Sequence, residues 1–217
     1  MDGLTAFWAQ SDSVGRAVAL LLLGMSVWAW ATILWKLRVL RRVEADLARA
    51  VPAFWGADGL DPAVQRLQAL DREGVLAPLV AAALTPVPAR TVSSLSGRGA
   101  QLTRQLRDAL HVSVVHLQSG QVLLASVGST APFVGLFGTV WGIYHALMGM
   151  AAEGTITLEK ISGPVGEALI MTAAGIAVAV PAVLAYNAFG KAVARCEAEL
   201  EGFAHDLREL ALQHPAG

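Results

Sequence analysis

Three long runs without charged residues dominate the pattern of hydrophobic and polar positions along this chain of 217 residues. The first covers residues 17–35, and the second has no Asp, Glu, Lys or Arg between residues 120 and 152. The third covers residues 161–190 and contains one charged residue, Glu167. At 1.5 Å per residue, even the shortest run forms a helix of about 28 Å, which matches the hydrocarbon core of a bilayer. We therefore predict transmembrane helices over residues 17–35, 120–150 and 161–190.

The region between the first two runs has the apolar spacing of helices. Apolar residues recur every three or four positions after residue 36, which predicts that the first transmembrane helix continues to the Gly56-Ala57-Asp58-Gly59 segment. Asp61-Pro62 has the order of an N-cap followed by proline at the first helical position, and predicts a short helix that ends near Arg72. A further apolar stripe then leads to Gly120. Its members are Leu102, Leu106, Leu110, Val114 and Leu117.

The region after the third run also has one apolar face, which predicts a C-terminal helix over residues 191–217. That face consists of Val193, Cys196, Leu200, Phe203, Leu207 and Leu210. No stretch shows the alternating pattern of a β-strand bounded by hairpin turns. The sequence therefore predicts an all-α integral membrane protein, whose three transmembrane helices extend into a helical domain over residues 36–119.

The distribution of Lys and Arg predicts how these helices are oriented. Fourteen of the 16 cations lie in segments 36–119 and 191–217, whereas segments 1–16 and 151–160 contain two. Because cation-rich loops stay in the cytoplasm, we place the N-terminus and the loop 151–160 outside. The first run could instead be a cleaved signal sequence ending near Ala31. Acidic residues precede it and cations follow it, however, which favours a retained anchor.

Composition excludes several functions. Hydrophobic residues make up 55% of the chain and charged residues 15%, which is unlike a water-soluble enzyme. A net charge of −1 argues against a nucleic-acid binder, and a single cysteine, Cys196, excludes an internal disulfide or a cysteine-based zinc cluster. We expect no metal, no cofactor and no nucleic acid, with the lipid bilayer as the surrounding medium.

Glu167 is the one carboxylate within a predicted membrane span. A charged side chain inside the membrane costs about 2.5–3.5 kcal/mol on insertion scales, so such a residue is a functional candidate by default. A structural alternative is that Gly163-Pro164 starts the helix, which would place Glu167 near the first turn, where a carboxylate stabilises the helix dipole. Both interpretations remain open from the residues alone.

Thr139 and Thr172 are predicted to lie at one level of the membrane. Counted from the outer ends of their spans, both are about 15–16 Å deep, on antiparallel helices. The alternative is that each hydroxyl bonds the carbonyl four residues earlier in its own helix. Glu167 and Thr172 are five residues apart, which separates them by about 140° around a helix, so they cannot both point straight at one axis.

Small residues predict close packing of the second and third spans. Glycines recur every seven residues in the second span, two of them form a G-x-x-x-G motif, and the third span is also rich in Gly and Ala. The predicted packing positions are Gly128, Gly135, Gly138, Gly142, Gly166 and Gly175. Three helices are too few to bury all of these faces and a carboxylate, so we expect a homo-oligomer or a partner helix.

Two stretches of the sequence carry a family resemblance. They are LASVGSTAPFVGLFGTVWGIYHALMGMA, from Leu124 to Ala151, and KISGPVGEALIMTAAGIAVAVPAVLAYNAF, from Lys160 to Phe189. Their most specific parts are GLFGTVWGI and GPVGEALIMTA. The chain resembles the MotA/TolQ/ExbB proton-channel family and looks most like its ExbB branch. The layout of three spans extends this resemblance to nearly the whole length.

The resemblance implies a homopentamer in the bacterial inner membrane, with a periplasmic N-terminus and a cytoplasmic C-terminus. Its pore would hold an ExbD-like single-span partner, and proton flow would energise a TonB-like protein for uptake across the outer membrane. The family's pattern places its membrane glutamate on Glu167 and its pore threonines on Thr139 and Thr172. Whether Glu167 faces the pore or a neighbouring helix stays open, as does the choice between H⁺ and Na⁺.

The alternatives to this function are a related channel subunit, a membrane scaffold and an enzyme. A TolQ-like subunit of the Tol-Pal envelope system is the alternative within the family, because the N-terminal segment of 16 residues is equally short there. A non-conducting membrane scaffold, in which Glu167 only caps a helix, is the alternative outside it. An enzyme is not expected, since the spans contain no Ser–His pair, paired Asp or H-E-x-x-H motif.

Overall fold

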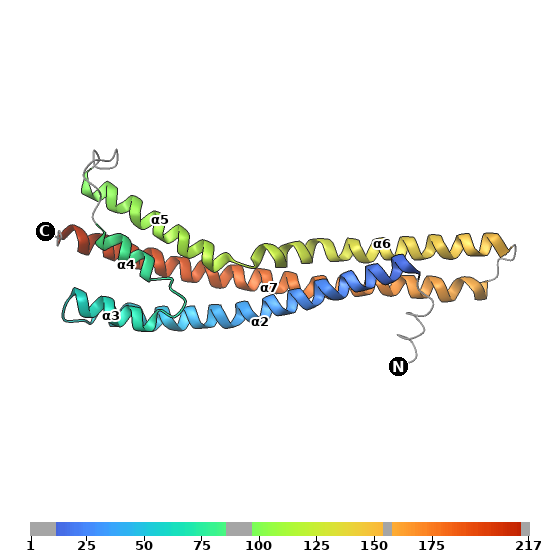
Figure 1. Ribbon diagram of the computed structural model, residues 1–217, viewed down its shortest axis with the longest axis horizontal. Helices are drawn as coiled ribbons and strands as arrows, with labels where there is room; N and C mark the ends of the chain where they lie inside the picture. Colours follow the sequence, from blue (N-terminus) through green and yellow to red (C-terminus); the bar gives the residue numbers. More distant parts are fainter. Residues whose placement is uncertain (1–11, 86–96, 154–157, 214–217) are drawn as a thin grey trace. The chain divides into compact units, whose positions relative to one another are not determined.

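The computed structural model describes residues 12–85, 97–153 and 158–213, and this part of the chain is helical with short connections. Figure 1 shows the helices, which are α2 (Ser13–Trp55), α3 (Leu60–Leu70), α4 (Ala77–Leu84), α5 (Arg98–Gln118), α6 (Gln121–Glu153) and α7 (Leu158–Gln213). No β-strand occurs among the described residues. Helices α2, α6 and α7 are long and apolar enough to cross a membrane. The predicted all-α fold with three membrane spans is confirmed.

The chain divides into two compact units, of which the first comprises residues 1–34 and 120–187. Within this unit α6 and α7 are antiparallel, since Gly128 lies against Val183 and Gly142 lies against Ala168. Much of the surface is apolar: Phe133 is 70% exposed and Leu184 is 64% exposed. Such a surface is stable where lipid surrounds it, because hydrocarbon chains are as apolar as these side chains.

The second unit comprises residues 35–119 and 188–217, and its core is that of a water-soluble helical domain. It is formed by the remaining parts of α2 and α7 together with α3, α4 and α5. Fully buried leucines and valines line its centre, among them Val43, Leu47, Leu67, Leu79, Leu117 and Leu200. The rings of Phe54 and Phe203 meet edge to face at 5.4 Å, which ties α2 to α7 within this unit.

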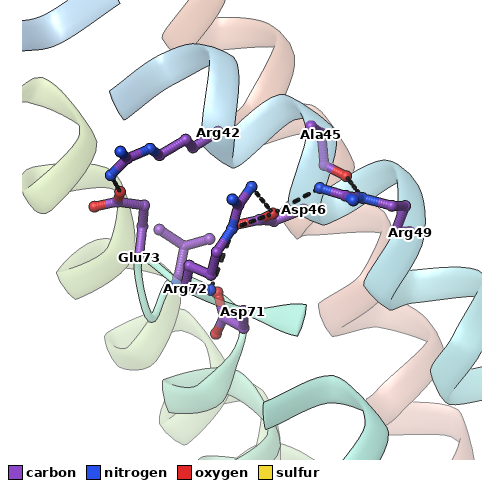
Figure 2. A network of polar contacts seen from close by, with 8 residues as sticks. Arg42, Ala45, Asp46, Arg49, Asp71, Arg72 and Glu73 are labelled. Carbon is purple, nitrogen blue, oxygen red and sulfur yellow. Dashed lines mark hydrogen bonds and ion pairs between the residues drawn. The ribbon is translucent and has the colours of Figure 1, made fainter. Parts of the chain in front are cut away.

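A buried carboxylate joins α2 to the connection between α3 and α4 (Figure 2). Asp46, which is 1% exposed, accepts hydrogen bonds from Arg72 Nη2 at 2.7 Å and Nε at 3.1 Å. Arg49 donates to the same carboxylate at 3.3 Å, and Arg42 pairs with Glu73 at 3.5 Å. The hydrogen bond and the charge of Asp46 raise the pKa of Arg72 above its usual range. The carboxylate is thus satisfied by partners whose own charged ends reach solvent.

Asp71 shapes the turn that follows α3. Its buried carboxylate accepts hydrogen bonds from the backbone N–H groups of Val75, Leu76 and Ala77, at 2.8–2.9 Å. These N–H groups have no partner within α4, because they precede or begin it. Gly74 has a φ of 66°, a left-handed conformation that glycine adopts without strain.

Two predicted helix starts are wrong. Helix α3 begins at Leu60 after Gly59, without a side-chain cap, so Asp61 and Pro62 lie inside its first turn, and the helix ends at Leu70 rather than near Arg72. A proline is tolerated there because the first N–H groups of a helix have no acceptor in any case. Helix α7 begins at Leu158, so Pro164 lies in its interior instead of at its start. A membrane helix tolerates an interior proline where its surroundings satisfy the freed carbonyl.

Candidate functional site

The hydroxyl groups of Thr139 and Thr172 meet between α6 and α7. Thr172 Oγ1 donates to Thr139 Oγ1 at 3.3 Å, and Thr139, which is 5% exposed, donates in turn to the carbonyl of Leu136 at 2.7 Å. The expectation that the two threonines share one level is met. Of the two, Thr139 also forms the alternative hydrogen bond within its own helix. Its acceptor is the carbonyl three residues earlier, not four residues earlier as predicted.

This arrangement leaves acceptor capacity on Thr172. A hydroxyl group has one proton and two lone pairs, and the proton of Thr172 is given to Thr139. Thr172 is half-buried, and its oxygen retains lone pairs that can accept a hydrogen bond. By contrast, the hydroxyls of Ser126 and Thr130 on α6 donate to carbonyls of their own helix. The pair thus links two helices through a short chain of hydrogen bonds.

Glycines bring the two backbones together around this pair. A Cβ atom on Gly135 would lie 2.5 Å from the carbonyl oxygen of Met171 and 3.1 Å from the Cα of Thr172. A Cβ atom on Gly175 would lie 2.6 Å from the carbonyl oxygen of Ala131. Backbone atoms cannot rotate out of the way, so neither position accepts a side chain unless the helices separate.

The other predicted packing glycines differ in how closely they are approached. A Cβ on Gly138 would come within 3.0 Å of Val18 on α2, and one on Gly142 within 3.1 Å of Ala168. On Gly128 it would meet a methyl group of Val183 at 2.5 Å. Nothing in the described chain lies within 4 Å of a Cβ on Gly166, so its packing role stays a prediction that depends on another chain.

Glu167 is the tenth residue of α7, and its side chain lies outside the described part of the structure. The structural alternative, in which this residue sits near the first turn of its helix, loses its basis because α7 begins earlier. The positions of α7 that face α6 are Ala168, Met171, Thr172 and Gly175. With 100° of rotation per residue, position 167 lies about 90° around the helix from the centre of that face. Its functional role stays a prediction.

Sequence reasoning missed a polar contact between the start of α2 and α6 in the first unit. Asp12 caps α2 by accepting from the backbone N–H of Gly15 at 2.7 Å, and it accepts from Trp141 Nε1 of α6 at 2.6 Å. Partial burial raises the pKa of Asp12, but the two hydrogen bonds and the nearby His145 lower it below its usual range. The predicted helix begins at residue 17, four residues after the observed start at Ser13, so Asp12 was not identified as its cap.

The described residues contain no group of three or more His, Cys, Asp or Glu side chains that could hold a metal ion. Cys196 is buried, and burial raises the pKa of its thiol to about 11, so it is a poor nucleophile and a poor metal ligand. What the site offers is a polar, closely packed contact between apolar helices. This arrangement defines the chain as a multi-pass membrane protein with hydroxyl groups inside its membrane unit.

Comparisons with known proteins agree with this class. The model of the MotA/TolQ/ExbB proton channel family matches residues 71–202. The Biopolymer transport protein ExbB of Xanthomonas campestris pv. campestris (strain B100) is 39% identical over 91% of this chain and 81% of that relative. The protein of the same name from Neisseria meningitidis serogroup A is 34% identical over 94% of both chains. The Tol-Pal system protein TolQ of Haemophilus influenzae is 29% identical over 89% of this chain and 87% of its own.

The chain therefore belongs to the MotA/TolQ/ExbB proton channel family. It is a transport protein and not an enzyme. The relatives named ExbB match it more closely than the full-length TolQ relative does.

Proposed function

We propose that this chain is the channel-forming subunit of an inner-membrane motor that couples the proton motive force to TonB-dependent uptake across the outer membrane. The observation that carries the proposal is the similarity to proteins named Biopolymer transport protein ExbB along nine-tenths of the chain. The hydroxyl pair supports it, because it places polar groups that can order water or a partner group inside a closely packed membrane interior.

In this proposal the subunits form a homopentamer around an ExbD-like single-span helix, and a TonB-like protein receives the motion. The exposed apolar surface of α6 and α7 supports assembly, since it offers more area than one chain can cover. The N-terminal segment 1–16 and the loop 151–160 lie in the periplasm, with spans over 17–35, 120–150 and 161–190. The segments 36–119 and 191–217, which carry fourteen of 16 cations, lie in the cytoplasm.

Glu167 takes up and releases the proton, while Thr139 and Thr172 order the water or partner group beside it. The position of Glu167, about 90° from the α6-facing side of α7, supports a contact with a helix outside this pair. Each charge that crosses 100 mV releases about 2.3 kcal/mol, so a few protons supply enough energy for a mechanical step.

The test is uptake in a strain whose own copy of the gene is replaced by variants of this chain. Glu167→Gln should abolish siderophore uptake, and Thr139→Val should reduce it about tenfold, because the hydrogen-bond chain is broken. Thr130→Val is the matched control, since Thr130 is on α6 and donates to its own helix, as Thr139 does, but is not joined to Thr172. Normal uptake in Glu167→Gln, with normal amounts of assembled protein, contradicts the proposal.

A TolQ-like role in the Tol-Pal envelope system is the second candidate. It is supported by the TolQ of Pseudomonas aeruginosa, which is 46% identical over 88 residues, or 41% of this chain. The two candidates differ in the expected phenotype: loss of an ExbB-like subunit should stop siderophore uptake, whereas loss of a TolQ-like subunit should impair constriction of the envelope. A deletion strain scored for both properties separates them.

A further inference from the structure

Lys36 is a buried lysine at the end of the first apolar run. It is 1% exposed and belongs to the largest fully buried side chains of the chain. A lysine that served only to mark the cytoplasmic end of a span would extend its ammonium group into water. Arg41 and Arg42, which follow on the same helix, are exposed and meet that need. The burial of Lys36 therefore requires a separate explanation.

The ammonium group of Lys36 binds the end of α5. Its Nζ donates to the carbonyl oxygen of Leu117 and to that of Ser119, the latter at 2.7 Å. The last carbonyls of a helix have no partner within it, and they form the negative end of the helix dipole. Lys36 thus supplies, from 81 residues earlier in the chain, the donor and the positive charge that this helix end lacks.

The bond lies where the chain leaves α5 for α6. The two helices are separated by Ser119 and Gly120, and Gly120 has a φ of 78°. Just beyond, the side-chain amide nitrogen of Gln121 is buried without a hydrogen-bond partner among the described residues.

The geometry points to Lys36 as a positioning residue for proton transfer, because its two hydrogen bonds fix the end of α5 from which α6, the helix that carries Thr139, continues. This inference rests on the proposed function for the transfer itself, but not for the contact. Removal of the ammonium leaves two buried carbonyl groups without donors, which loosens the break between the helices. Lys36 acts through α6 and does not touch the transferred proton.

Burial affects the protonation of this residue in a way that can be measured. Burial lowers the pKa of Lys36 to about 8, and no charge of the described residues adds to this shift. If the helix end opened, the amine of Lys36 would be in water, where its pKa would be the ordinary 10.5 and it would hold its proton more tightly. The two carbonyl contacts act in the opposite direction, because they stabilise the charged form, and at pH 7 the bound group is the ammonium.

The test uses the full-length protein assembled with its partner in membranes. The variants are Lys36→Met, which keeps the length of the side chain without donors, and Lys36→Arg, which keeps the charge and the donors. Arg41→Met is the matched control, because it removes a cation from the same helix but leaves the end of α5 bound. Amide hydrogen exchange in peptides covering residues 114–124 reports on the helix end, and proton flux into vesicles reports on function.

We expect the amides of residues 114–124 to exchange about tenfold faster in Lys36→Met, and its proton flux to fall about tenfold. Arg41→Met should match the wild type in both measurements. Lys36→Arg should recover at least part of the protection and of the flux. Native flux in Lys36→Met overturns the positioning role, and so does a Lys36→Arg chain as defective as Lys36→Met. If Lys36→Met does not accumulate, Lys36→Arg decides: protection and flux that change together, or stay native together, support the positioning role, and a change in one without the other overturns it. Absence of flux in the wild type refutes the proposed function and, with it, the positioning role.

Discussion

Replacement of Gly135 by alanine tests whether close backbone packing holds the threonine pair together. The added Cβ would lie 2.5 Å from the carbonyl oxygen of Met171, whereas ordinary contacts begin at 3.4 Å, so α6 and α7 must separate locally by about 0.9 Å. The hydrogen bond between Thr172 and Thr139 is already 3.3 Å long, and such a separation breaks it.

The expected cost follows from two opposing terms. Overpacking of a close contact costs about 1–3 kcal/mol, whereas alanine in place of glycine gains about 0.5–1 kcal/mol in a helix. Gly135→Ala should therefore lose about 1–2 kcal/mol of stability and lower the melting temperature by a few degrees. Proton flux should fall with it, because the hydroxyl pair is separated.

Gly149→Ala is the matched control, since Gly149 is also on α6 but has nothing within 4 Å of an added Cβ. Thermal unfolding of the assembled protein in detergent, followed by tryptophan fluorescence, measures stability, and proton flux into vesicles measures function. A Gly135→Ala protein that is as stable as Gly149→Ala and conducts normally would refute the reasoning.

Two other substitutions and one labelling experiment test separate features of the structure. Asp46→Ala removes the buried acceptor of Arg72 and Arg49, and should lower the stability of the second unit by about 1–3 kcal/mol in chemical denaturation. Glu73→Ala should have a smaller effect, because its ion pair with Arg42 is partly exposed to solvent. Cys196 should resist alkylation at pH 8, because burial raises its pKa to about 11; rapid labelling by a maleimide in the folded protein would contradict this. Asp12 has a lowered pKa, so its stabilising effect is present above the ordinary value of 3.8 and is lost as the pH falls through the lower folded value. Melting curves of the wild type and Asp12→Ala, which lacks the cap, should differ at pH 6 and converge at the acid end.

The large features of the fold could be predicted from the sequence because lipid imposes simple rules on it. A span needs about 20 apolar residues, and each of the three runs that satisfy this became a long helix. The end of α2 at Trp55 and the break at Gly120 followed from glycines, which stop helices for local reasons. These features depend only on residues that are close together in the chain, so they can be predicted from the sequence.

The two predictions of helix starts were wrong because a proline is compatible with two positions in a helix. At the first turn of a helix it is favourable, and within a membrane helix it is tolerated, so Pro62 and Pro164 were consistent with more than one start. The residues before each proline determined where the helix starts, and their helix propensities are too weak to predict that start. The error mattered at Glu167, whose structural alternative depended on a start at Gly163.

The common level of the two threonines could be predicted from the sequence, whereas the contacts of Lys36 and Asp12 could not. Counting residues from the membrane edge placed Thr139 and Thr172 at one level, because antiparallel helices of known rise leave little freedom. Lys36 and Asp12 bind groups 81 and 129 residues away, and no local pattern specifies such partners. Lys36 entered only the count of cations that predicts the orientation, and Asp12 only the choice between a signal sequence and a retained anchor.

Proton flux through the reconstituted assembly tests the central claim most directly. Vesicles that contain a pH-sensitive dye, the wild-type chain and its single-span partner would be given a potassium diffusion potential, with Glu167→Gln assembled in parallel and empty vesicles as the reference. The account predicts flux in the wild type that exceeds the reference and is abolished by Glu167→Gln at equal amounts of assembled protein. Equal flux in the two proteins, or wild-type flux no greater than that of empty vesicles, would contradict it.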